Sequence, residues 1–270
     1  MSEKKKRFLF IVEGAKREMD IFDNFASVFF NDKSEVVTVS APADMNIYML
    51  YDALKKDNFE TDIVEVLKER VAKARKILKN FTRNSFAEVY LFFDFDAHAN
   101  NLRKKSNVEV LKEMFEVFNN ETELGKLYIS YPMVEAIRDH DPNDCGVVSG
   151  SCFRNRTDFG TYKKDSASLV DNNDVGSYDF VKWMTAISNY VYRSSCLFCK
   201  TELSRDDFLN SVSPIAIFDK QIAIYSKSEN VFVLSCLPEF LIDYSTKYWD
   251  ASIGKRKKPI LRNGCGKLPN

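Results

Sequence analysis

The sequence predicts an α/β fold in which a doubly wound, mainly parallel sheet is flanked by helices. In the first half of the chain, short apolar runs alternate with segments whose apolar residues recur at helical spacing, as Phe22, Phe25 and Phe29 do. The apolar runs have the length of strands and are bounded by charged residues. Strands that alternate with helices along a chain pair in parallel, because each helix carries the chain back to the start of the next strand.

Four strands and four helices are predicted in this half. The strands are expected at residues 8–12, 35–39, 88–96 and 126–130. The helices are expected at residues 18–30, 44–55, 60–80 and 108–118. In the third helical segment the apolar residues gather near one face and the charged residues on the other, which predicts one long helix that covers the sheet.

The second half of the chain predicts a helix-rich accessory region with a basic tail. We therefore expect two domains, of residues 1–142 and 143–270. Residues 151–179 are polar and rich in turn-forming residues, which predicts a flexible connection or a substrate loop. A helix is expected from about Tyr178 to Arg193, because its apolar residues again recur at helical spacing.

The composition predicts a soluble, folded protein of the cytoplasm. The chain has 270 residues, 45% of them hydrophobic, which is enough for a sizeable core. No apolar stretch approaches the roughly 20 residues that cross a bilayer, and the amino terminus lacks the apolar segment of a signal peptide. The six cysteines include one C-x-x-C, at residues 196–199, without a second one to complete a zinc site. We expect ordinary reduced thiols.

The charge is balanced overall but not along the chain. There are 39 basic and 39 acidic residues, so the whole protein has no net attraction for nucleic acid. Basic residues nevertheless gather in runs that can bind a phosphate backbone. The candidates for nucleic-acid binding are Lys16, Arg17, Arg103, Lys104, Lys105, Lys255, Arg256, Lys257 and Lys258. The alternative for each run is a solvated surface that aids solubility.

Acidic residues stand where the predicted strands end. Glu13 follows the first strand, and Asp94 and Asp96 close the third. Ligands bind at the carboxyl ends of strands in such sheets. Alternate residues of an extended segment point the same way, about 6 to 7 Å apart, so Asp94 and Asp96 can share one site. Gathered carboxylates favour a cation between them, and hard oxygen ligands select Mg²⁺ or Mn²⁺. Each acid taken alone is also explained as a helix cap or a solvated turn.

Three motifs at predicted strand ends carry a family resemblance. Glu13 and Gly14 form a Glu-Gly pair, residues 94–96 form Asp-x-Asp, and residues 130–135 form Ser-x-Pro-x-x-Glu. In this order they resemble the TOPRIM domain of topoisomerases, bacterial primases and several nucleases. The third motif, together with Glu18, resembles the nuclease branch typified by OLD-family proteins and related phage-defence effectors. The resemblance covers about residues 7–140.

The resemblance implies a TOPRIM-like, mainly parallel four-stranded sheet. It also implies a metal-dependent nuclease of DNA or RNA, and its family setting is phage defence by abortive infection. Glu13 would bind metal or move protons, and Asp94 and Asp96 would bind metal. The implied catalytic residues are Glu13, Asp94, Asp96 and Glu135, and the implied ligands of Mg²⁺ or Mn²⁺ are Glu13, Glu18, Asp94 and Asp96.

The sequence leaves the partners and one rival function open. It contains no G-x-x-x-x-G-K-[ST] phosphate loop, so control by ATP would come from an ATPase partner in trans. A homodimer is left open as well. The rival function is a catalytically silent TOPRIM module that binds nucleic acid or a protein partner and uses its acids for structure.

Overall fold

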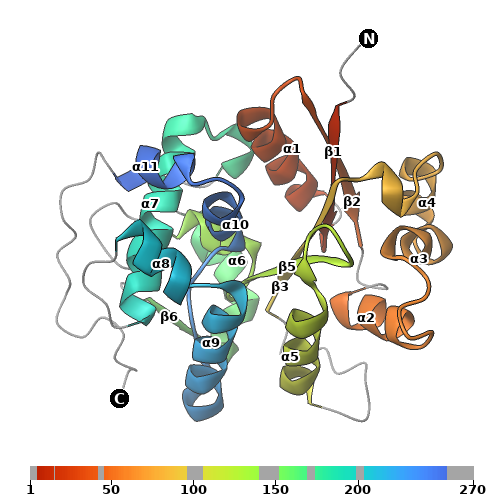
Figure 1. The fold of residues 1–270 in the computed structure, drawn as a ribbon. Helices are drawn as coiled ribbons and strands as arrows, with labels where there is room; N and C mark the ends of the chain where they lie inside the picture. The colour runs from red at the N-terminus through yellow and green to blue at the C-terminus, as the bar shows by residue number, and fades with distance from the viewer. Residues whose placement is uncertain are drawn as a thin grey trace. The chain divides into compact units, whose positions relative to one another are not determined.

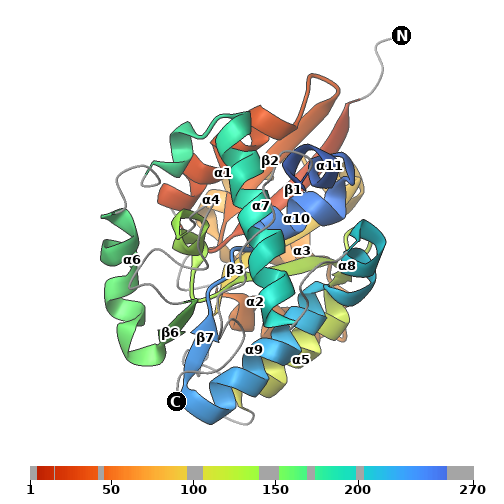
Figure 2. The ribbon, with the colours of Figure 1, turned by 90° about the vertical axis from the view of Figure 1, so that its left-hand side faces the viewer.

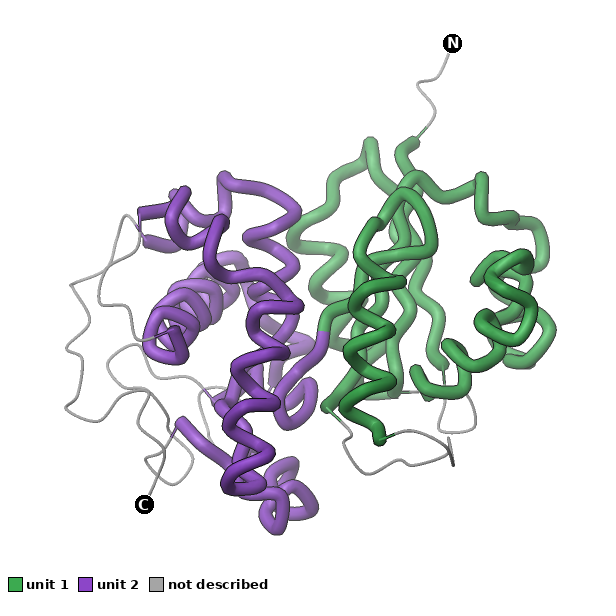
Figure 3. Tube along the Cα trace, turned by 60° about the horizontal axis from the view of Figure 1, so that its bottom comes forward, with its two compact units in different colours: residues 1–128 green, residues 129–270 purple. Residues whose placement is uncertain are grey.

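The computed structural model describes residues 5–14, 16–41, 46–95, 106–139, 152–168, 174–198 and 204–253. The chain divides into two compact units, Met1–Tyr128 and Ile129–Asn270 (Figure 3). The boundary predicted between residues 142 and 143 lies outside the described residues.

A five-stranded sheet forms the centre of the amino-terminal half (Figure 1). Its strands are β1 (Lys6–Val12), β2 (Ser34–Ser40), β3 (Glu88–Asp94), β4 (Asn119–Asn120) and β5 (Gly125–Ser130). The strand order is β2-β1-β3-β5-β4, and β1 pairs in parallel with β2 and β3. The expected α/β class with a mainly parallel sheet and flanking helices is confirmed.

The sheet has one strand more than the four that were predicted. The additional strand is β4, which consists of Asn119 and Asn120 and pairs antiparallel to β5. Two asparagines carry no hydrophobic alternation, so the sequence pattern could not indicate a strand there. The third strand also ends two residues earlier than predicted, at Asp94.

The helices lie on both faces of the sheet. They are α1 (Arg17–Phe29), α2 (Ile47–Lys55), α3 (Ile63–Arg70), α4 (Ala72–Ile77) and α5 (Asn107–Val117). Figure 1 shows α1 on one side of the strands and α3 and α4 on the other. The side chain of Glu113 in α5 accepts hydrogen bonds from Tyr51 and Lys55 of α2, so these two helices pack together. This is the doubly wound arrangement that the alternation of elements predicted.

The long helix predicted at residues 60–80 is wrong, because two helices occupy this segment. They are separated by Val71, which has an extended backbone with φ −116° and ψ 106°. Asp62 is the N-cap of the first helix, and its side chain accepts hydrogen bonds from the backbone N–H groups of Val64 and Glu65. A continuous amphipathic pattern spans both helices and hides the break.

An aromatic cluster fixes α1 on the sheet. The ring of Phe10 in β1 lies 5.9 Å from that of Phe22 and 5.3 Å from that of Phe92. The rings of Phe22 and Phe92 are 4.8 Å apart, so α1 contacts β1 and β3 at once. Each of these side chains is almost completely buried. Burial of a phenylalanine side chain contributes about 1.5–3 kcal/mol to stability, so this cluster sets the position of α1 beside the carboxyl ends of the strands.

The second unit contains helices and a small antiparallel sheet. The elements are α6 (Phe159–Ala167), α7 (Phe180–Leu197), α8 (Arg205–Ser211), α9 (Pro214–Ser228), α10 (Cys236–Tyr244), α11 (Lys247–Ile253), β6 (Phe153–Asn155), β7 (Asn230–Phe232) and a 3₁₀ helix (Val134–Arg138). The two strands pair with each other. The long helix α7 packs against α10 and α11 (Figure 2), and Trp183 of α7 is completely buried.

The flexible connection or substrate loop predicted at residues 151–179 is wrong for much of that segment. It contains β6 and α6, with residues 169–173 outside the description. The ring of Phe153 in β6 packs against that of Phe232 in β7 at 5.2 Å, and Tyr162 of α6 is completely buried. The polar composition of the segment conceals these two anchoring aromatic residues.

The expectation of reduced cysteines is wrong at Cys196. Cys196, at the end of α7, is disulfide-bonded. Cys152 and Cys236 are buried and form no disulfide. Within the described part of the chain, none of the helices has the length and apolar character that crossing a membrane requires.

Gly125, at the start of β5, is expected to be essential for the fold. Its φ is +120°, and a Cβ at this position would lie 2.5 Å from Leu91 Cδ1. Gly125→Ala should therefore lower the free energy of unfolding by about 2–4 kcal/mol, measured by urea denaturation. The control is Gly160→Ala in α6, where an added Cβ meets nothing within 4 Å; it should be neutral or stabilising by up to about 1 kcal/mol. Equal effects of the two changes would contradict the strain assigned to Gly125.

Candidate functional site

The carboxyl ends of β1 and β3 lie next to each other at the point where the chain changes direction across the sheet. From β1 the chain passes through α1 to β2 on one side, whereas β3 lies on the other side of β1. In open α/β sheets, ligands bind in the crevice at such a switch point. Glu13 and Asp94 are the acids at these two strand ends, so the topology brings them to the position where such folds bind ligands.

A hydrogen bond joins these two strand ends. Oε2 of Glu13 accepts the backbone N–H of Asp94 at 3.1 Å. Val12 lies opposite Phe92 in the parallel register, so Glu13 follows the paired region directly and Asp94 follows it after one residue, Phe93. Both residues are partly exposed. The bond orients the Glu13 carboxylate toward β3, where the sequence predicted a second carboxylate of the same site.

Glu18 belongs to the same turn through its contact with Gly14. Oε2 of Glu18 accepts the backbone N–H of Gly14 at 2.7 Å. A Cβ on residue 14 would overlap with Glu18 Oε1 and lie 2.5 Å from its Cδ. Glycine at position 14 therefore leaves the space that the Glu18 carboxylate fills. This contact gives Glu18 a role in shaping the turn, and metal binding by Glu18 stays a prediction.

The chemistry of Glu13 and Asp94 fits a hard divalent cation. Carboxylate oxygens are the ligands that Mg²⁺ prefers in proteins. Among the residues that the structure describes, however, no group of three or more His, Cys, Asp or Glu side chains is arranged to hold a metal ion. The third predicted ligand, Asp96, lies outside those residues. The Glu13 carboxylate thus contacts the backbone of a second predicted ligand, Asp94, and the whole predicted metal set stays a prediction.

Two of the predicted phosphate-binding residues stand at the start of α1. Lys16 and Arg17 follow the Glu13–Gly14 turn and are exposed to solvent. The remaining basic candidates, at positions 103–105 and 255–258, lie outside the described residues. Lys16 and Arg17 are therefore the basic candidates that the structure links to the carboxyl edge of the sheet.

Ser40 is a polar residue at this edge that sequence reasoning missed. It ends β2 and lies opposite Val12, the residue before Glu13. The residue is only 7% exposed, and its hydroxyl has no hydrogen-bond partner in the described structure. Buried hydroxyl groups in proteins usually have a partner, so an unsatisfied one next to a candidate site is notable. A single serine at the end of a β-branched strand has no spacing that could have marked it in the sequence.

Glu135, a predicted catalytic residue, lies in the second unit within the 3₁₀ helix. It is 2% exposed, and its Oε1 makes an ion pair with Nζ of Lys163 at 3.2 Å. The side chain of Lys163 is 62% exposed. The buried carboxylate thus has its counter-charge at the surface of α6, which accounts for Glu135 structurally and leaves its catalytic role a prediction.

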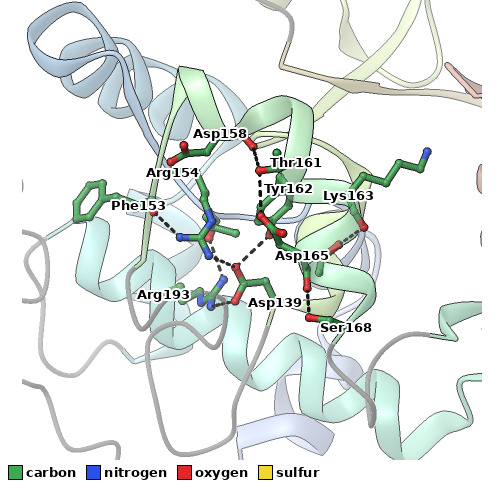
Figure 4. A network of polar contacts seen from close by, with 12 residues as sticks. Asp139, Phe153, Arg154, Asp158, Thr161, Tyr162, Lys163, Asp165, Ser168 and Arg193 are labelled. Carbon is green, nitrogen blue, oxygen red and sulfur yellow. Dashed lines mark hydrogen bonds and ion pairs between the residues drawn. The ribbon is translucent and has the colours of Figure 1, made fainter.

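A second polar cluster in this unit centres on Asp139, which is completely buried (Figure 4). Oδ1 of Asp139 accepts a hydrogen bond from Arg193 at 3.3 Å, and Oδ2 accepts one from the Tyr162 hydroxyl at 3.1 Å. Arg154 forms an ion pair with Oδ2 at 3.9 Å. Burial raises the pKa of Tyr162 well above its usual value, and the charge of Asp139 raises it further. Tyr162 therefore stays a neutral hydrogen-bond donor.

The sequence did not indicate the Asp139 cluster. Its four members come from four elements: the end of the 3₁₀ helix, β6, α6 and α7. Buried charged residues carry no periodic pattern, so no local signal could have found them.

Comparisons of the chain with family models, with curated proteins and with solved structures yield no match. The interpretation of the carboxyl edge of the sheet and of the Asp139 cluster therefore depends on their geometry and chemistry.

The contact between Gly14 and Glu18 predicts energetic coupling. In Gly14→Ala the new Cβ would displace the Glu18 carboxylate and break its hydrogen bond to the backbone of residue 14. This change should cost about 1–2 kcal/mol of unfolding free energy in the natural sequence and much less in a Glu18→Ala background. Urea denaturation of the four proteins of this double-mutant cycle measures the coupling. Additive effects would show that the two residues do not interact.

The ion pair of Glu135 makes a second prediction. Lys163→Met keeps the length of the side chain but leaves the buried carboxylate without its counter-charge, so it should cost about 1–3 kcal/mol of stability. Lys164→Met, at the next and exposed position of α6, is the matched control and should change stability by less than about 0.5 kcal/mol. Similar denaturation midpoints for the two variants would show that Glu135 does not depend on Lys163.

Proposed function

We propose that the chain is a Mg²⁺-dependent nuclease of the TOPRIM kind, which hydrolyses phosphodiester bonds at the carboxyl edge of its parallel sheet. The observation that carries the proposal is the hydrogen bond from the Asp94 backbone to Glu13 Oε2, at the switch point between β1 and β3. It brings together two of the acids that the resemblance to TOPRIM nucleases marks as functional. Both stand at the strand ends where such sheets bind ligands.

The residues of the edge have distinct tasks in this proposal. Glu13 is held by the Asp94 backbone and binds the cation or transfers a proton, and Asp94 holds the cation, joined by Asp96. Bound Mg²⁺ supplies electrostatic stabilisation of the charge that develops on the phosphate oxygens. Glu18 keeps the Glu13–Gly14 turn in shape through its bond to the Gly14 N–H. Lys16 and Arg17 are close enough along the chain to meet the phosphate backbone of the substrate.

The biological setting of the proposal comes from the resemblance alone. TOPRIM nucleases of the OLD type and related effectors act in phage defence, and abortive infection is the corresponding role for this chain. An ATPase partner would supply any ATP-driven control, since the sequence has no phosphate loop. The substrate is DNA or RNA.

A catalytically silent binding module is the second candidate. The observation that favours it is that both acids accept a backbone N–H, as structural caps do: Glu13 that of Asp94 at the end of β3, and Glu18 that of Gly14 after β1. In that function the acids would hold the turn between β1 and α1, and the exposed Lys16 and Arg17 would contact nucleic acid. The two functions differ in whether a divalent cation is needed for turnover.

Glu13→Gln and Asp94→Asn separate the two candidates. The side-chain amide introduced by Glu13→Gln can still accept the backbone N–H of Asp94, and Asp94→Asn leaves that backbone donor in place. Both variants should fold as the natural protein does, yet lose at least about 100-fold in cleavage rate. The measurement is cleavage of supercoiled DNA, single-stranded DNA, ribosomal RNA and tRNA with Mg²⁺ or Mn²⁺, and with EDTA.

Charge-matched controls and thermal shifts complete the experiment. Glu116→Gln removes an exposed carboxylate from α5 and should leave cleavage unchanged. Mg²⁺ should raise the melting temperature of the natural protein by mass action, and Asp94→Asn should abolish the rise. Nucleic-acid binding that needs no cation, together with absence of cleavage on every substrate, would favour the silent module and overturn the nuclease.

A further inference from the structure

Basic side chains gather on α3 and α4 of the first unit. Residues 63–83 carry seven basic side chains and two acidic ones, and both acids, Glu65 and Glu69, belong to α3. No acidic residue occurs from position 70 to position 83. The chain as a whole has equal numbers of basic and acidic residues, so this stretch is a local excess of positive charge.

The fold itself uses three of these seven basic side chains. Lys68 forms an ion pair with Glu65 at 2.7 Å. The guanidinium group of Arg75 donates to two backbone carbonyls near the end of α3. The guanidinium group of Arg83 donates to three backbone carbonyls of neighbouring segments. These contacts give the three side chains a structural role.

The other four basic side chains have no such role. They form neither an ion pair nor a side-chain hydrogen bond within the part of the chain that the structure describes, and all four are exposed to solvent. We refer to these four residues as the α4 basic surface: Arg70, Lys73, Lys76 and Lys79.

The arrangement of these charges does not favour the fold. Lys73 is in the first turn of α4, where the helix dipole disfavours a cation. Lys76 lies three residues further along the same helix, so the two like charges are neighbours and repel each other. The buried side of this segment consists of Val71, Ala74 and Leu78, so neither lysine contributes to the core. Solubility alone is served as well by basic and acidic residues in mixture. The gathering of cations therefore indicates a negatively charged partner.

The spacing of the lysines fits a phosphate backbone. Residues three apart on a helix have Cβ atoms about 5–6 Å apart, as Lys73 and Lys76 do in α4. Lys79 follows after three more residues, in a turn that the Phe81 N–H closes on the carbonyl of Leu78. The flexible side chains of the three lysines can therefore reach successive phosphates of one nucleic-acid strand. Contacts of this kind depend on charge and not on base sequence.

The apolar residues of α4 favour nucleic acid over a membrane or a protein. Among residues 72–77, Ile77 is the one large apolar side chain, and it is 41% exposed. A helix that binds a membrane surface needs a wide apolar face, which α4 does not offer to solvent. Protein interfaces likewise have an apolar core. Interfaces with nucleic acid are polar and strongly positive, as this surface is.

The α4 basic surface lies away from the candidate site. The chain leaves α4, passes through a 3₁₀ helix (Arg83–Ser85) and enters the amino end of β3, whereas Asp94 stands at the carboxyl end of that strand. The seven residues of β3 span about 20 Å. A duplex that contacts both places must therefore be longer than about six base pairs.

We infer that the α4 basic surface binds the phosphate backbone of a nucleic acid, independently of base sequence, and holds it at a second place besides the carboxyl edge of the sheet. The inference rests on the proposed function for its biological meaning, because it assigns a further surface to the substrate of that nuclease. Binding at this surface needs neither a cation nor cleavage.

Binding in EDTA tests the surface without cleavage. The probes are a labelled DNA duplex of about 20 base pairs and a labelled RNA strand of about 20 nucleotides, titrated by fluorescence anisotropy at several salt concentrations. The variant combines Lys73→Gln, Lys76→Gln and Lys79→Gln. It should bind each probe at least about 10-fold more weakly, and its slope of log K against log salt for the duplex should be smaller by about 2–3.

A second triple variant is the control for charge. It combines Lys112→Gln, Lys164→Gln and Lys227→Gln, which remove the same charge from exposed positions of α5, α6 and α9. Its affinity for both probes should change by less than about 3-fold. Both triple variants should melt at the temperature of the natural chain or above it, because none of the six lysines forms an ion pair within the described structure.

The outcomes separate this inference from the proposed nuclease. Unchanged binding by the variant of the α4 basic surface, or equal weakening in both triple variants, would overturn the inference. So would a natural chain that binds neither probe, or one that uses these lysines to bind vesicles of phosphatidylserine and phosphatidylcholine and not nucleic acid. A chain that binds through the α4 basic surface but cleaves neither probe with Mg²⁺ would support the inference and overturn the nuclease.

Discussion

Parallel pairing of β1 with β3 is the constraint on which the candidate site depends. The segment Phe8–Val12 is completely buried, because helices cover both faces of the sheet. Burial on both faces fixes the register, and the register determines which residues emerge together at the carboxyl edge. With Val12 opposite Phe92, the carboxylate of Glu13 reaches the backbone N–H of Asp94. The hydrogen bond is therefore a consequence of how the core packs. The packing of the core also determines the geometry at which the proposed chemistry would take place.

The sequence was most informative where hydrophobic pattern and strand ends coincide. Short apolar runs predicted the four longer strands, and the rule that ligands bind at carboxyl strand ends directed attention to Glu13 and Asp94. The hydrophobic pattern does not predict the break at Val71, because both helices continue one amphipathic pattern. Strand β4 was missed since Asn119 and Asn120 pair through their backbones alone. Ser40 was missed because a single buried hydroxyl has no spacing that could mark it.

The second unit shows a different limit of sequence reasoning. Its polar cluster joins Asp139, Arg154, Tyr162 and Arg193, which are up to 54 residues apart in the chain. Charged residues normally predict an exposed surface, and residues 151–179 were accordingly interpreted as a polar connection. Their burial follows from long-range packing, such as that of Phe153 against Phe232. Because this burial arises only when distant segments meet, no short stretch of the sequence predicts it.

Buried charge in this unit also needs an explanation beyond stability. A buried ion pair contributes little net stability compared with apolar residues of similar volume, because desolvation offsets the attraction. Gln221 of α9 shows how the same unit satisfies an isolated polar side chain: its Nε2 donates to the Phe232 carbonyl at 2.7 Å, and its Oε1 accepts the Phe232 N–H at 2.9 Å. Arg193 and Tyr190 do not reach this complete pairing within the described structure. The hydroxyl of Ser194, next to Arg193 in α7, likewise has no hydrogen-bond partner in the described structure, so this unit satisfies some of its buried polar groups completely and others only in part.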